Sequence, residues 1–538
     1  MAAEEALARA LLTLASCPII VSYHPVRTLV FAGLHATFLS MRVTVIGTGY
    51  VGTVTGACLA YLGHRVSCVD TDAAKIAKLQ RGETPIYEPH LTELLAEAAT
   101  RGGIEFTTEL EQAAADSDVI FIAVGTPPRP SGEANLSFLE AAARSIGAAM
   151  DGERFRVVVN KSTVPVGCGN LVETLVREGI REMHPHDDKR IQFGVASNPE
   201  FLREGCAIAD SLYPDRIVLG AEDERTMETL RELYAPLVEQ RFPAPAYVPR
   251  PAAVGQVPLV ATTLTSAEMI KYAANTFLAM KIGFANEIAN LCERVGADAK
   301  EVMAGIGLDS RVGSKFLNAG LGWGGSCFGK DIQSLLHTAE EYGYNARLLD
   351  AALAVNRAQR LVAIQKLQEK LFILKGRTIA LLGLAFKPDT DDLRDAPSLQ
   401  IAERLLQLGA RVKAYDPIAM SACRAQNPEL KIQYCDSALD AVVDADAAVL
   451  VTEWDEFRVL DLAHMASLMQ QPILVDGRNL YDPETARSAG LDYTGIGRSA
   501  RPRFASARVA ANGAVQISPS PRSIAADPVP VLFNGSAK

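Results

Sequence analysis

The sequence lacks several features that would place it in common protein classes. It has no C-x-x-C pair among its nine cysteines, and a chain of 538 residues needs no disulfide framework to hold a core. It has no apolar run of 18 residues, because His24, Arg27 and His35 interrupt the most apolar N-terminal stretch. These absences argue against a disulfide-stapled secreted domain and a transmembrane helix, and a reducing cytoplasm fits the chain best.

The chain also lacks an excess of positive charge. Lys and Arg number 53 against 63 Asp and Glu, so the formal net charge is −10, and no basic stripe stands out. Binding to nucleic acid or to an anionic membrane surface through charge alone is therefore not expected. The apolar fraction of 49% and the length predict two or three domains, each with its own core.

A buried strand over 42–46 is predicted to run directly into a glycine-rich turn, followed by a small-residue helix over 53–62 and a second strand over 65–69. This order of strand, turn, helix and strand is the context in which such a turn binds a dinucleotide, with the pyrophosphate at the helix N-terminus. The candidate cofactor-binding residues of the turn are Gly47, Gly49, Tyr50, Val51 and Gly52.

An acidic residue completes this unit. Asp70 ends the second predicted strand, eighteen residues after Gly52. Its carboxylate would accept hydrogen bonds from the ribose hydroxyls of an adenosine and would repel a 2′-phosphate. The predicted cofactor is therefore NAD rather than NADP.

Strands and helices continue to alternate after Asp70, a pattern typical of an open, largely parallel sheet. Two predicted strands, over 118–123 and 156–160, end in loops with small and hydroxyl-bearing side chains, 124–128 and 161–167. Ligands of such sheets lie beyond the carboxyl ends of the strands, so both loops are expected to border a binding site.

A further strand near 193–196 leads to an acidic segment, 197–205. If this segment is helical, Glu200 and Glu204 share one face of the helix. The alternative is a solvated acidic turn, because exposed carboxylates are common.

A long helix is predicted over 266–295, after an irregular Pro- and Ala-rich crossing over 242–258. Lys271 and Asn275 lie four residues apart and therefore on one face of this helix. A surface lysine that extends its ammonium into water is the alternative, but the small residues around the pair favour close packing. A helix of this length can join two domains and pair with its copy in a dimer.

A glycine-rich stretch, 322–331, delivers Cys327 to the expected start of a helix. The unpaired N–H groups of a helix start lower the pKa of a thiol, which makes Cys327 a candidate nucleophile. The alternative is a small buried side chain without chemistry. Asp331 would lie on the same helical face, and Lys330 adds a cation beside it.

A second α/β unit is predicted after the cysteine, with strands over 377–383 and 412–415 and a helix over 398–408. Its first turn lacks the three glycines, so it should hold a nucleotide differently, through Lys387 and the stretch that contains Arg478.

The predicted fold class is α/β, with two Rossmann-like doubly wound domains joined by a long central helix and a helical dimerisation region. The first segment is expected to be dispensable, with Met41 the true start; a targeting segment is the alternative. The predicted segments are an extension over 1–40, an NAD-binding domain over 41–245, a central helical domain over 259–372, a second Rossmann-like domain over 373–500 and a disordered tail over 501–538.

Taken together, these pieces resemble the UDP-glucose 6-dehydrogenase family within the nucleotide-sugar dehydrogenases, over roughly 41–497. The resemblance implies oxidation of the C6 alcohol of UDP-glucose to a carboxylate, with two NAD+ and one water, in a protein that forms homodimers or multiples of dimers and holds no metal. It also implies that the domain over 373–500 is UDP-binding. The stretches that carry it are 47–52, 85–89, 161–167, 198–205, 266–277, 324–331 and 383–394.

The resemblance also implies catalytic roles. Cys327 would attack the half-oxidised sugar to form a thiohemiacetal, which a second hydride transfer turns into a thioester. Lys271 and Asn275 would stabilise the oxyanions formed along the way.

Hydrolysis of the thioester needs a positioned water molecule. By the same resemblance, Asp331 would act as general base or orient this water, which Thr163 and Glu200 hold. Glu204 would lie near the nicotinamide.

The resemblance implies two further sets of ligand contacts. Cofactor contacts beyond the glycine-rich turn are expected from Asp70, Lys75, Thr126, Thr163, Glu204, Lys330 and Arg394. Substrate contacts are expected from Glu200, Phe201, Leu202, Glu204, Lys271, Asn275, Arg311 across a dimer interface, Phe316, Asn318, Gly320, Gly324, Lys387 and Arg478.

The sequence departs from the family pattern at His90, Cys168 and Gly329, none of which removes a reacting group, and Trp323 in the substrate loop could alter sugar selectivity. The same chemistry on GDP-mannose or a UDP-N-acetylhexosamine is therefore an alternative. A non-catalytic NAD-binding regulator is a second alternative, but such a protein has no chemical reason to keep Cys327 together with its polar partners.

Overall fold

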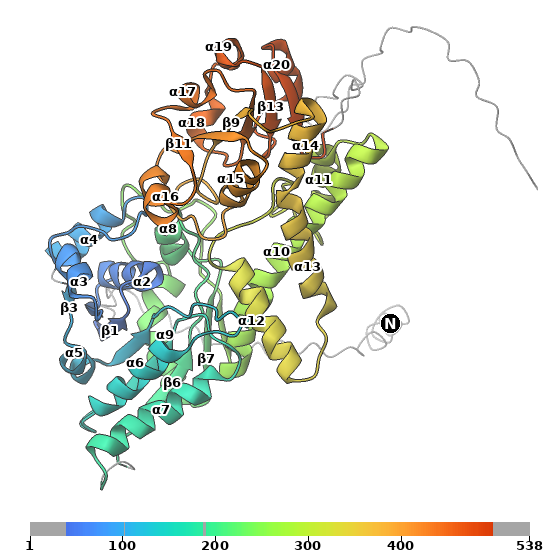
Figure 1. Ribbon diagram of the computed structural model, residues 1–538. Coiled ribbons are helices and arrows are strands. Elements are labelled where there is room, and N and C mark those ends of the chain that lie inside the picture. The colour runs from blue at the N-terminus through green and yellow to red at the C-terminus, as the bar shows by residue number, and fades with distance from the viewer. Residues whose placement is uncertain (1–38, 102, 187–189, 499–538) are drawn as a thin grey trace, which may run out of the picture. The chain divides into compact units, whose positions relative to one another are not determined.

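The computed structural model describes residues 39–101, 103–186 and 190–498 (Figure 1). The predicted extension over 1–40, apart from its last two residues, and the predicted tail over 501–538 lie outside the described residues. Among the helices of the described part, none is long and apolar enough to cross a membrane.

An eight-stranded sheet organises the N-terminal half of the described chain. Its strand order is β3-β2-β1-β4-β5-β6-β7-β8, with every neighbouring pair parallel except the antiparallel β6 and β7. The strands are β1 (Arg42–Ile46), β2 (Arg65–Val69), β3 (Ile104–Thr107), β4 (Val119–Ile122), β5 (Arg156–Asn160), β6 (Phe193–Ser197), β7 (Ile217–Ala221) and β8 (Leu259–Thr262).

Helices cover both faces of this sheet, which explains why β4 and β5 are buried at every position. Along β4, Val119 and Phe121 belong to one core cluster and Ile120 and Ile122 to another. The first core includes α2 (Tyr50–Tyr61), α4 (Leu91–Thr100), α8 (Ala207–Leu212) and α9 (Glu224–Val238); the second includes α5 (Leu110–Asp116), α6 (Ser137–Ala148) and α7 (Cys168–Met183). The short α3 (Ala73–Gln80) follows β2.

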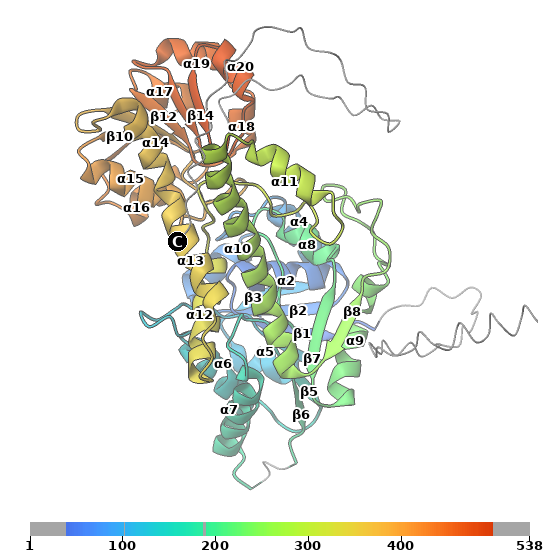
Figure 2. The same ribbon diagram turned by 90° about the vertical axis from the view of Figure 1, so that its right-hand side faces the viewer.

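The long predicted helix is present as α10 (Leu264–Val295), which has 32 residues and spans about 48 Å. The hydroxyl of Thr263 accepts the Ser266 N–H at its start, and Gly296 ends it with a φ of 77°. Figure 2 shows α10 beside α11 (Ala299–Gly307), α12 (Phe328–Glu341) and α13 (Arg347–Arg360), which all pack on it.

A six-stranded, all-parallel sheet follows the connecting helix α14 (Val362–Leu371), in the order β11-β10-β9-β12-β13-β14. Its strands are β9 (Thr378–Leu382), β10 (Arg411–Tyr415), β11 (Ile432–Tyr434), β12 (Ala447–Leu450), β13 (Ile473–Asp476) and β14 (Asp492–Gly495). Its helices are α15 (Pro397–Gln407), α16 (Met420–Gln426), α17 (Ala438–Val442), α18 (Asp455–Arg458), α19 (Leu462–Leu468) and α20 (Pro483–Ser488).

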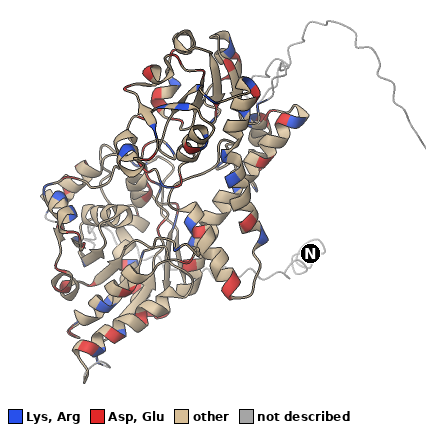
Figure 3. Ribbon diagram, in the orientation of Figure 1, with Lys and Arg blue, Asp and Glu red and all other residues tan. Residues whose placement is uncertain are grey.

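The predicted fold class is confirmed. In each sheet the order of the strands reverses once, at the β1/β4 boundary in the first sheet and at the β9/β12 boundary in the second. Such a boundary is the topological switch point at which doubly wound sheets bind ligands. Acidic and basic residues are interspersed over the described chain in the view of Figure 3.

Candidate active site

The glycine-rich turn after β1 leaves space for a ligand at the start of α2. A Cβ on Gly47, where φ is 98°, would lie 2.7 Å from the Ala123 oxygen, and a Cβ on Gly52 would lie 1.8 Å from the Gly47 oxygen. By contrast, no atom lies within 4 Å of the Cβ position of Gly49, the N-cap of α2. Close packing therefore requires glycine on both sides of an open position at a helix N-terminus, which fits a dinucleotide pyrophosphate.

Asp70 is fixed and ionised at the end of β2. Its Oδ2 accepts the Thr48 N–H at 2.8 Å and the Lys75 ammonium at 2.9 Å. Burial opposes the charge on Asp70, but Lys75 and the N–H groups of Thr48 and Asp72 outweigh it and lower the pKa to about 2. The carboxylate can therefore accept hydrogen bonds from ribose hydroxyls over the whole physiological pH range.

The two predicted loops meet beyond β4 and β5. The Thr126 hydroxyl donates to the Thr163 carbonyl oxygen at 2.7 Å, and the Ser162 hydroxyl donates to the Val124 carbonyl oxygen at 2.8 Å. These bonds join the loops at the carboxyl edge of the sheet, on the same edge as the glycine-rich turn.

Helix α10 presents two buried polar side chains to neighbouring elements. The Lys271 ammonium donates to Glu200 Oε1 at 2.8 Å, and the Asn275 amide donates to Asp331 Oδ2 at 2.6 Å. The alternative of a solvated surface lysine is therefore wrong, since Lys271 is only 4% exposed. Asp331 also accepts the Lys330 ammonium at 2.7 Å.

The charges of the buried pair reinforce each other. Burial opposes the charge of Glu200, but Lys271 and the Leu202 N–H, which donates at 2.7 Å, lower the pKa of the carboxyl. Burial likewise opposes the charge of Lys271, but Glu200 and Asp331 raise the pKa of the ammonium. Both groups are therefore charged at neutral pH.

Cys327 is the N-cap of α12, as predicted, and remains accessible to solvent. The expectation of a lowered thiol pKa is wrong. Desolvation by the surrounding protein and the negative charge of Glu200 raise the pKa of Cys327, and Lys271 only partly opposes them. A helix start alone does not determine the charge of a thiol when a buried carboxylate lies near it.

Glu200 and Glu204 lie in a loop rather than on a helical face, because the chain from Asn198 to α8 is irregular. The prediction of a shared helical face is therefore wrong. Phe201 lies between them, with the Lys271 nitrogen 5.4 Å from its ring centroid. The loop directs Glu200 toward α10, whereas Glu204 meets the C-terminal domain.

Three residues that follow β9 hold Glu204. The Thr390 hydroxyl donates to its Oε2 at 3.1 Å and Arg394 donates to its Oε1 at 3.2 Å, while the Lys387 ammonium donates to its backbone oxygen. Desolvation and the nearby Asp392 raise the pKa of Glu204 to about 7, against the effect of Arg394 and Lys387. Arg394, a predicted cofactor residue, and Lys387, a predicted substrate residue, therefore both bind Glu204.

The predicted substrate loop before Cys327, 316–324, is anchored on both sides by hydrogen bonds. The Gly320 N–H donates to Asn286 Oδ1 at 2.8 Å, and the Arg478 guanidinium donates to the Gly322 carbonyl oxygen at 3.2 Å. A Cβ on Gly324 would lie 2.5 Å from the Asp395 oxygen, so this glycine is required by close packing.

Not every predicted substrate residue joins this group. Phe316 has a φ of 64° at the start of the loop, and Asn318 is exposed. Arg311 pairs with Asp309 at 2.6 Å on the surface of the described chain and contacts none of the catalytic candidates.

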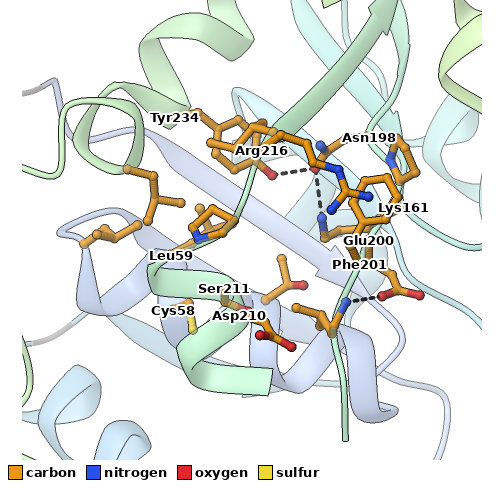
Figure 4. Close-up of a pocket in the computed structure, with 17 residues that line it drawn as sticks. Cys58, Leu59, Lys161, Asn198, Glu200, Phe201, Asp210, Ser211, Arg216 and Tyr234 are labelled. Carbon is orange, nitrogen blue, oxygen red and sulfur yellow. Dashed lines mark hydrogen bonds between the residues drawn. The ribbon is translucent and has the colours of Figure 1, made fainter. Parts of the chain in front are cut away.

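A cavity of about 80 Å³ borders Glu200 on the side of α2 and α8 (Figure 4). Lys161 directly follows β5 and lines the cavity. Its ammonium donates to Asn198 Oδ1 at 2.9 Å, and the Tyr234 hydroxyl donates to the same atom at 2.5 Å. Burial and the charge of Lys271 lower the pKa of Lys161 to about 8, although Glu200 opposes them.

Lys161 and Thr390 lie in stretches that the sequence pattern assigned to the site, 161–167 and 383–394, but neither was predicted as a site residue. A lysine that directly follows a continuous apolar strand was the available signal for Lys161, because that position lies at the ligand-binding edge of the sheet. Thr390 carried no signal in the sequence, since its role depends on a contact with Glu204 across 186 residues.

The chain matches three domains of one family, in order along the sequence. Residues 41–238 match the NAD binding domain, 265–358 the central domain and 380–483 the UDP binding domain of the UDP-glucose/GDP-mannose dehydrogenase family. The chain belongs to this family. As a UDP-glucose/GDP-mannose dehydrogenase family member it is an NAD-dependent oxidoreductase with a nucleotide-sugar substrate, which confirms the predicted family and cofactor.

Named relatives extend the match over most of the chain. The UDP-glucose 6-dehydrogenase TuaD of Bacillus subtilis (strain 168) is 45% identical over 459 residues, covering 85% of this chain and 94% of that protein. The UDP-glucose 6-dehydrogenase of Rhizobium meliloti (strain 1021) is 47% identical over 465 residues, covering 85% of this chain and 100% of that protein.

Solved structures of the family share the fold. A UDP-glucose dehydrogenase from the hyperthermophilic archaeon Pyrobaculum islandicum aligns with a TM-score of 0.76 at 38% identity, over 87% of this chain and 100% of that chain. A UDP-D-ManNAc dehydrogenase from Pyrococcus horikoshii aligns with a TM-score of 0.71 at 28% identity, over 85% of this chain and 99% of that chain.

Proposed function

We propose that this chain oxidises UDP-glucose at C6 to UDP-glucuronate in two hydride transfers, with Cys327 as a covalent nucleophile. The observation that carries the proposal is the set of polar side chains around this cysteine: Lys271 paired with Glu200, and Asn275 paired with Asp331. A non-catalytic NAD-binding protein would have no use for a solvent-accessible thiol beside two buried, paired carboxylates.

The residues around the glycine-rich turn fit NAD, which supplies the hydride acceptor when bound. Gly49 offers an open helix N-terminus to the pyrophosphate, and Asp70 offers a carboxylate to the ribose. Lys75, Thr126, Lys330 and Arg394 are proposed to complete the cofactor site. The UDP group is proposed to bind beyond β9, near Lys387 and Arg478.

In the covalent step, the sulfur of Cys327 forms a bond to C6 of the aldehyde produced by the first oxidation. The thiol proton passes to a proton acceptor as the C–S bond forms, because the raised pKa of Cys327 keeps the thiol protonated at neutral pH. The aldehyde oxygen becomes an oxyanion beside Lys271 and Asn275 and takes up a proton to give the thiohemiacetal. Transfer of a second hydride from C6 to a second NAD+, with loss of the hydroxyl proton, then gives the thioester.

Hydrolysis completes the reaction. A water molecule held between Thr163 and Glu200 attacks C6 of the thioester, and Asp331 takes up or directs its proton. The C–S bond breaks, the sulfur of Cys327 leaves as thiolate and takes up a proton because its pKa is raised, and the sugar leaves as a carboxylate. The buried ion pair keeps Glu200 ionised, so that it can accept a hydrogen bond from this water.

We further propose that the protein acts as a homodimer in the cytoplasm, with domains over 41–245, 259–372 and 373–500. Phe277, Phe284 and Leu291 lie seven residues apart on α10, and each is at least half exposed in the single chain. Apolar residues at this spacing form one stripe along a helix, which a second copy can cover. Arg311 would then reach the substrate site of the second copy.

A panel of nucleotide sugars tests the proposed substrate. We expect UDP-glucose to be oxidised with the highest kcat/KM and UDP-glucuronate to be identified by mass. The same chemistry on a UDP-N-acetylhexosamine is a second candidate, because the UDP-D-ManNAc dehydrogenase from Pyrococcus horikoshii shares the fold at 28% identity. A higher kcat/KM for that sugar or for GDP-mannose would contradict the first choice.

A further inference from the structure

The sequence stretch 85–89 has no part in the proposed chemistry, yet its Glu88 is buried and fully bonded. Glu88 Oε1 accepts the Ala207 N–H at 2.7 Å. Its Oε2 accepts the Gly205 N–H at 2.6 Å and the Tyr50 hydroxyl. Glu88 is 7% exposed, so its carboxylate is bonded to protein groups rather than to solvent.

These bonds connect two parts of the chain that face different ligands. Tyr50 is the first residue of α2, directly after the open position at Gly49 where a pyrophosphate fits. Gly205 follows Glu204, which Lys387, Thr390 and Arg394 hold from the UDP binding domain. Glu88 therefore links the dinucleotide turn to the loop that contacts the C-terminal domain.

The backbone at this junction has little freedom to move. Gly205 has a φ of 80°, and a Cβ there would lie 2.7 Å from the Asp389 oxygen. The Gly205 N–H also lies 3.0 Å from the Tyr50 oxygen. Burial and the adjacent Glu88 raise the pKa of Tyr50, so its hydroxyl keeps its proton and donates to the carboxylate.

We propose that Glu88 is a positioning residue that couples binding of the dinucleotide at the Tyr50 turn to binding of the nucleotide sugar at the Glu204 loop. This inference rests on the proposed function for the identity of the two ligands. Because Tyr50, Glu88 and the backbone of Gly205 are bonded to one another, a shift of Tyr50 on cofactor binding is transmitted to the Glu204 loop. By reciprocity, each ligand then tightens the other.

The test measures the Kd of UDP-glucose by calorimetry, with and without saturating NADH. NADH cannot accept a hydride from the sugar, so no turnover disturbs the measurement. We expect NADH to tighten UDP-glucose at least about fivefold in the unmodified enzyme. Tyr50→Phe and Glu88→Gln should each reduce this ratio to below about twofold.

Tyr61→Phe is the matched control. Tyr61 lies on the same helix, is more buried than Tyr50, and loses a comparable hydroxyl bond, at 2.9 Å to the Pro243 oxygen, without a bond to Glu88. This variant should keep the unmodified ratio. A ratio near one in the unmodified enzyme, or equal ratios for Tyr50→Phe and Tyr61→Phe, would overturn the inference.

Two further measurements keep the inference testable if a variant misfolds or if the substrate is not UDP-glucose. Binding of NADH by Tyr50→Phe shows that the N-terminal domain of this variant is folded. If Glu88→Gln does not fold, the NADH effect on UDP-glucose binding is judged from Tyr50→Phe alone. The same ratio measured with UDP tests the coupling independently of the sugar. Binding of UDP without binding of UDP-glucose would therefore refute the proposed substrate, while the coupling would still be measured.

Discussion

Asn275 Nδ2 lies 2.6 Å from Asp331 Oδ2, so a buried hydrogen bond joins the central helix α10 to the helix that begins at the candidate nucleophile. One turn earlier on α10, Lys271 makes its own bond to Glu200 at 2.8 Å. Two residues of one helix therefore orient two carboxylates that come from distant parts of the chain, and both carboxylates lie near Cys327.

Asp331→Asn should lower kcat about 10²- to 10⁴-fold, because the amide cannot accept a proton from the attacking water. The KM for the nucleotide sugar should change little. Steady-state NADH formation measures both constants. Glu340→Gln, an exposed change on the same helix, serves as the control and should behave like the unmodified enzyme. Equal kcat values for the two variants would remove Asp331 from the chemistry.

Lys271→Met should lower the free energy of unfolding by about 3–5 kcal/mol, because it leaves the Glu200 carboxylate buried without its main partner. Adding Glu200→Gln to this variant should restore part of the lost stability, while activity stays absent. Urea unfolding measures both effects. A single variant as stable as the unmodified enzyme would show that the pair is not a coupled unit.

Glu204 should make the protein less stable as the pH rises. Its pKa in the folded chain is about 7, above the ordinary value of 4.5, so the folded state holds the extra proton between these values. The contribution of Glu204 is therefore fully present below pH 4.5 and is lost as the pH rises through 7. Unfolding of Glu204→Gln should show a flatter pH dependence over this range, and an unchanged slope would contradict the assignment.

Asp70→Asn should raise the ratio of kcat/KM for NADP to that for NAD. The change removes the negative charge that repels a 2′-phosphate and frees the Lys75 ammonium, which now pairs with Asp70 at 2.9 Å. Initial rates with both cofactors measure the ratio. The control is Glu105→Gln, an exposed change on β3. An equal ratio in the two variants would mean that Asp70 does not select the cofactor.

Phe284→Asp should convert the proposed dimer into monomers, because it puts a charge in the middle of the apolar stripe on α10. Light scattering coupled to size exclusion reports the mass. Phe138→Asp changes a phenylalanine that is similarly exposed on α6 and should leave the mass unchanged. A monomeric unmodified protein would refute the dimer directly.

The sequence was informative wherever a signal was local. The strands predicted over 65–69 and 156–160 match the bounds of β2 and β5, and the glycine spacing after β1 predicted the dinucleotide turn. The predicted helix over 266–295 differs from α10 by two residues at its start, because Thr263 rather than a later residue caps it. These features depend on neighbours within one or two turns of the chain.

The errors arose where distant segments meet. The pKa of Cys327 is raised by desolvation and by the charge of Glu200, and both effects come from segments that lie far from Cys327 in the sequence. Glu204 leaves the expected helix because Lys387, Thr390 and Arg394 bind it from the second α/β domain. No periodicity encodes such contacts, since they depend on how two domains pack.

The count of NADH formed per nucleotide sugar, measured for the unmodified enzyme and for Cys327→Ser, tests the central claim most directly. With UDP-glucose limiting, the account predicts two NADH per sugar for the unmodified enzyme and a failure to reach two for the serine variant, because a serine hydroxyl is far harder to ionise than a thiol. Two NADH per sugar from Cys327→Ser at the normal rate would contradict the covalent role of the cysteine.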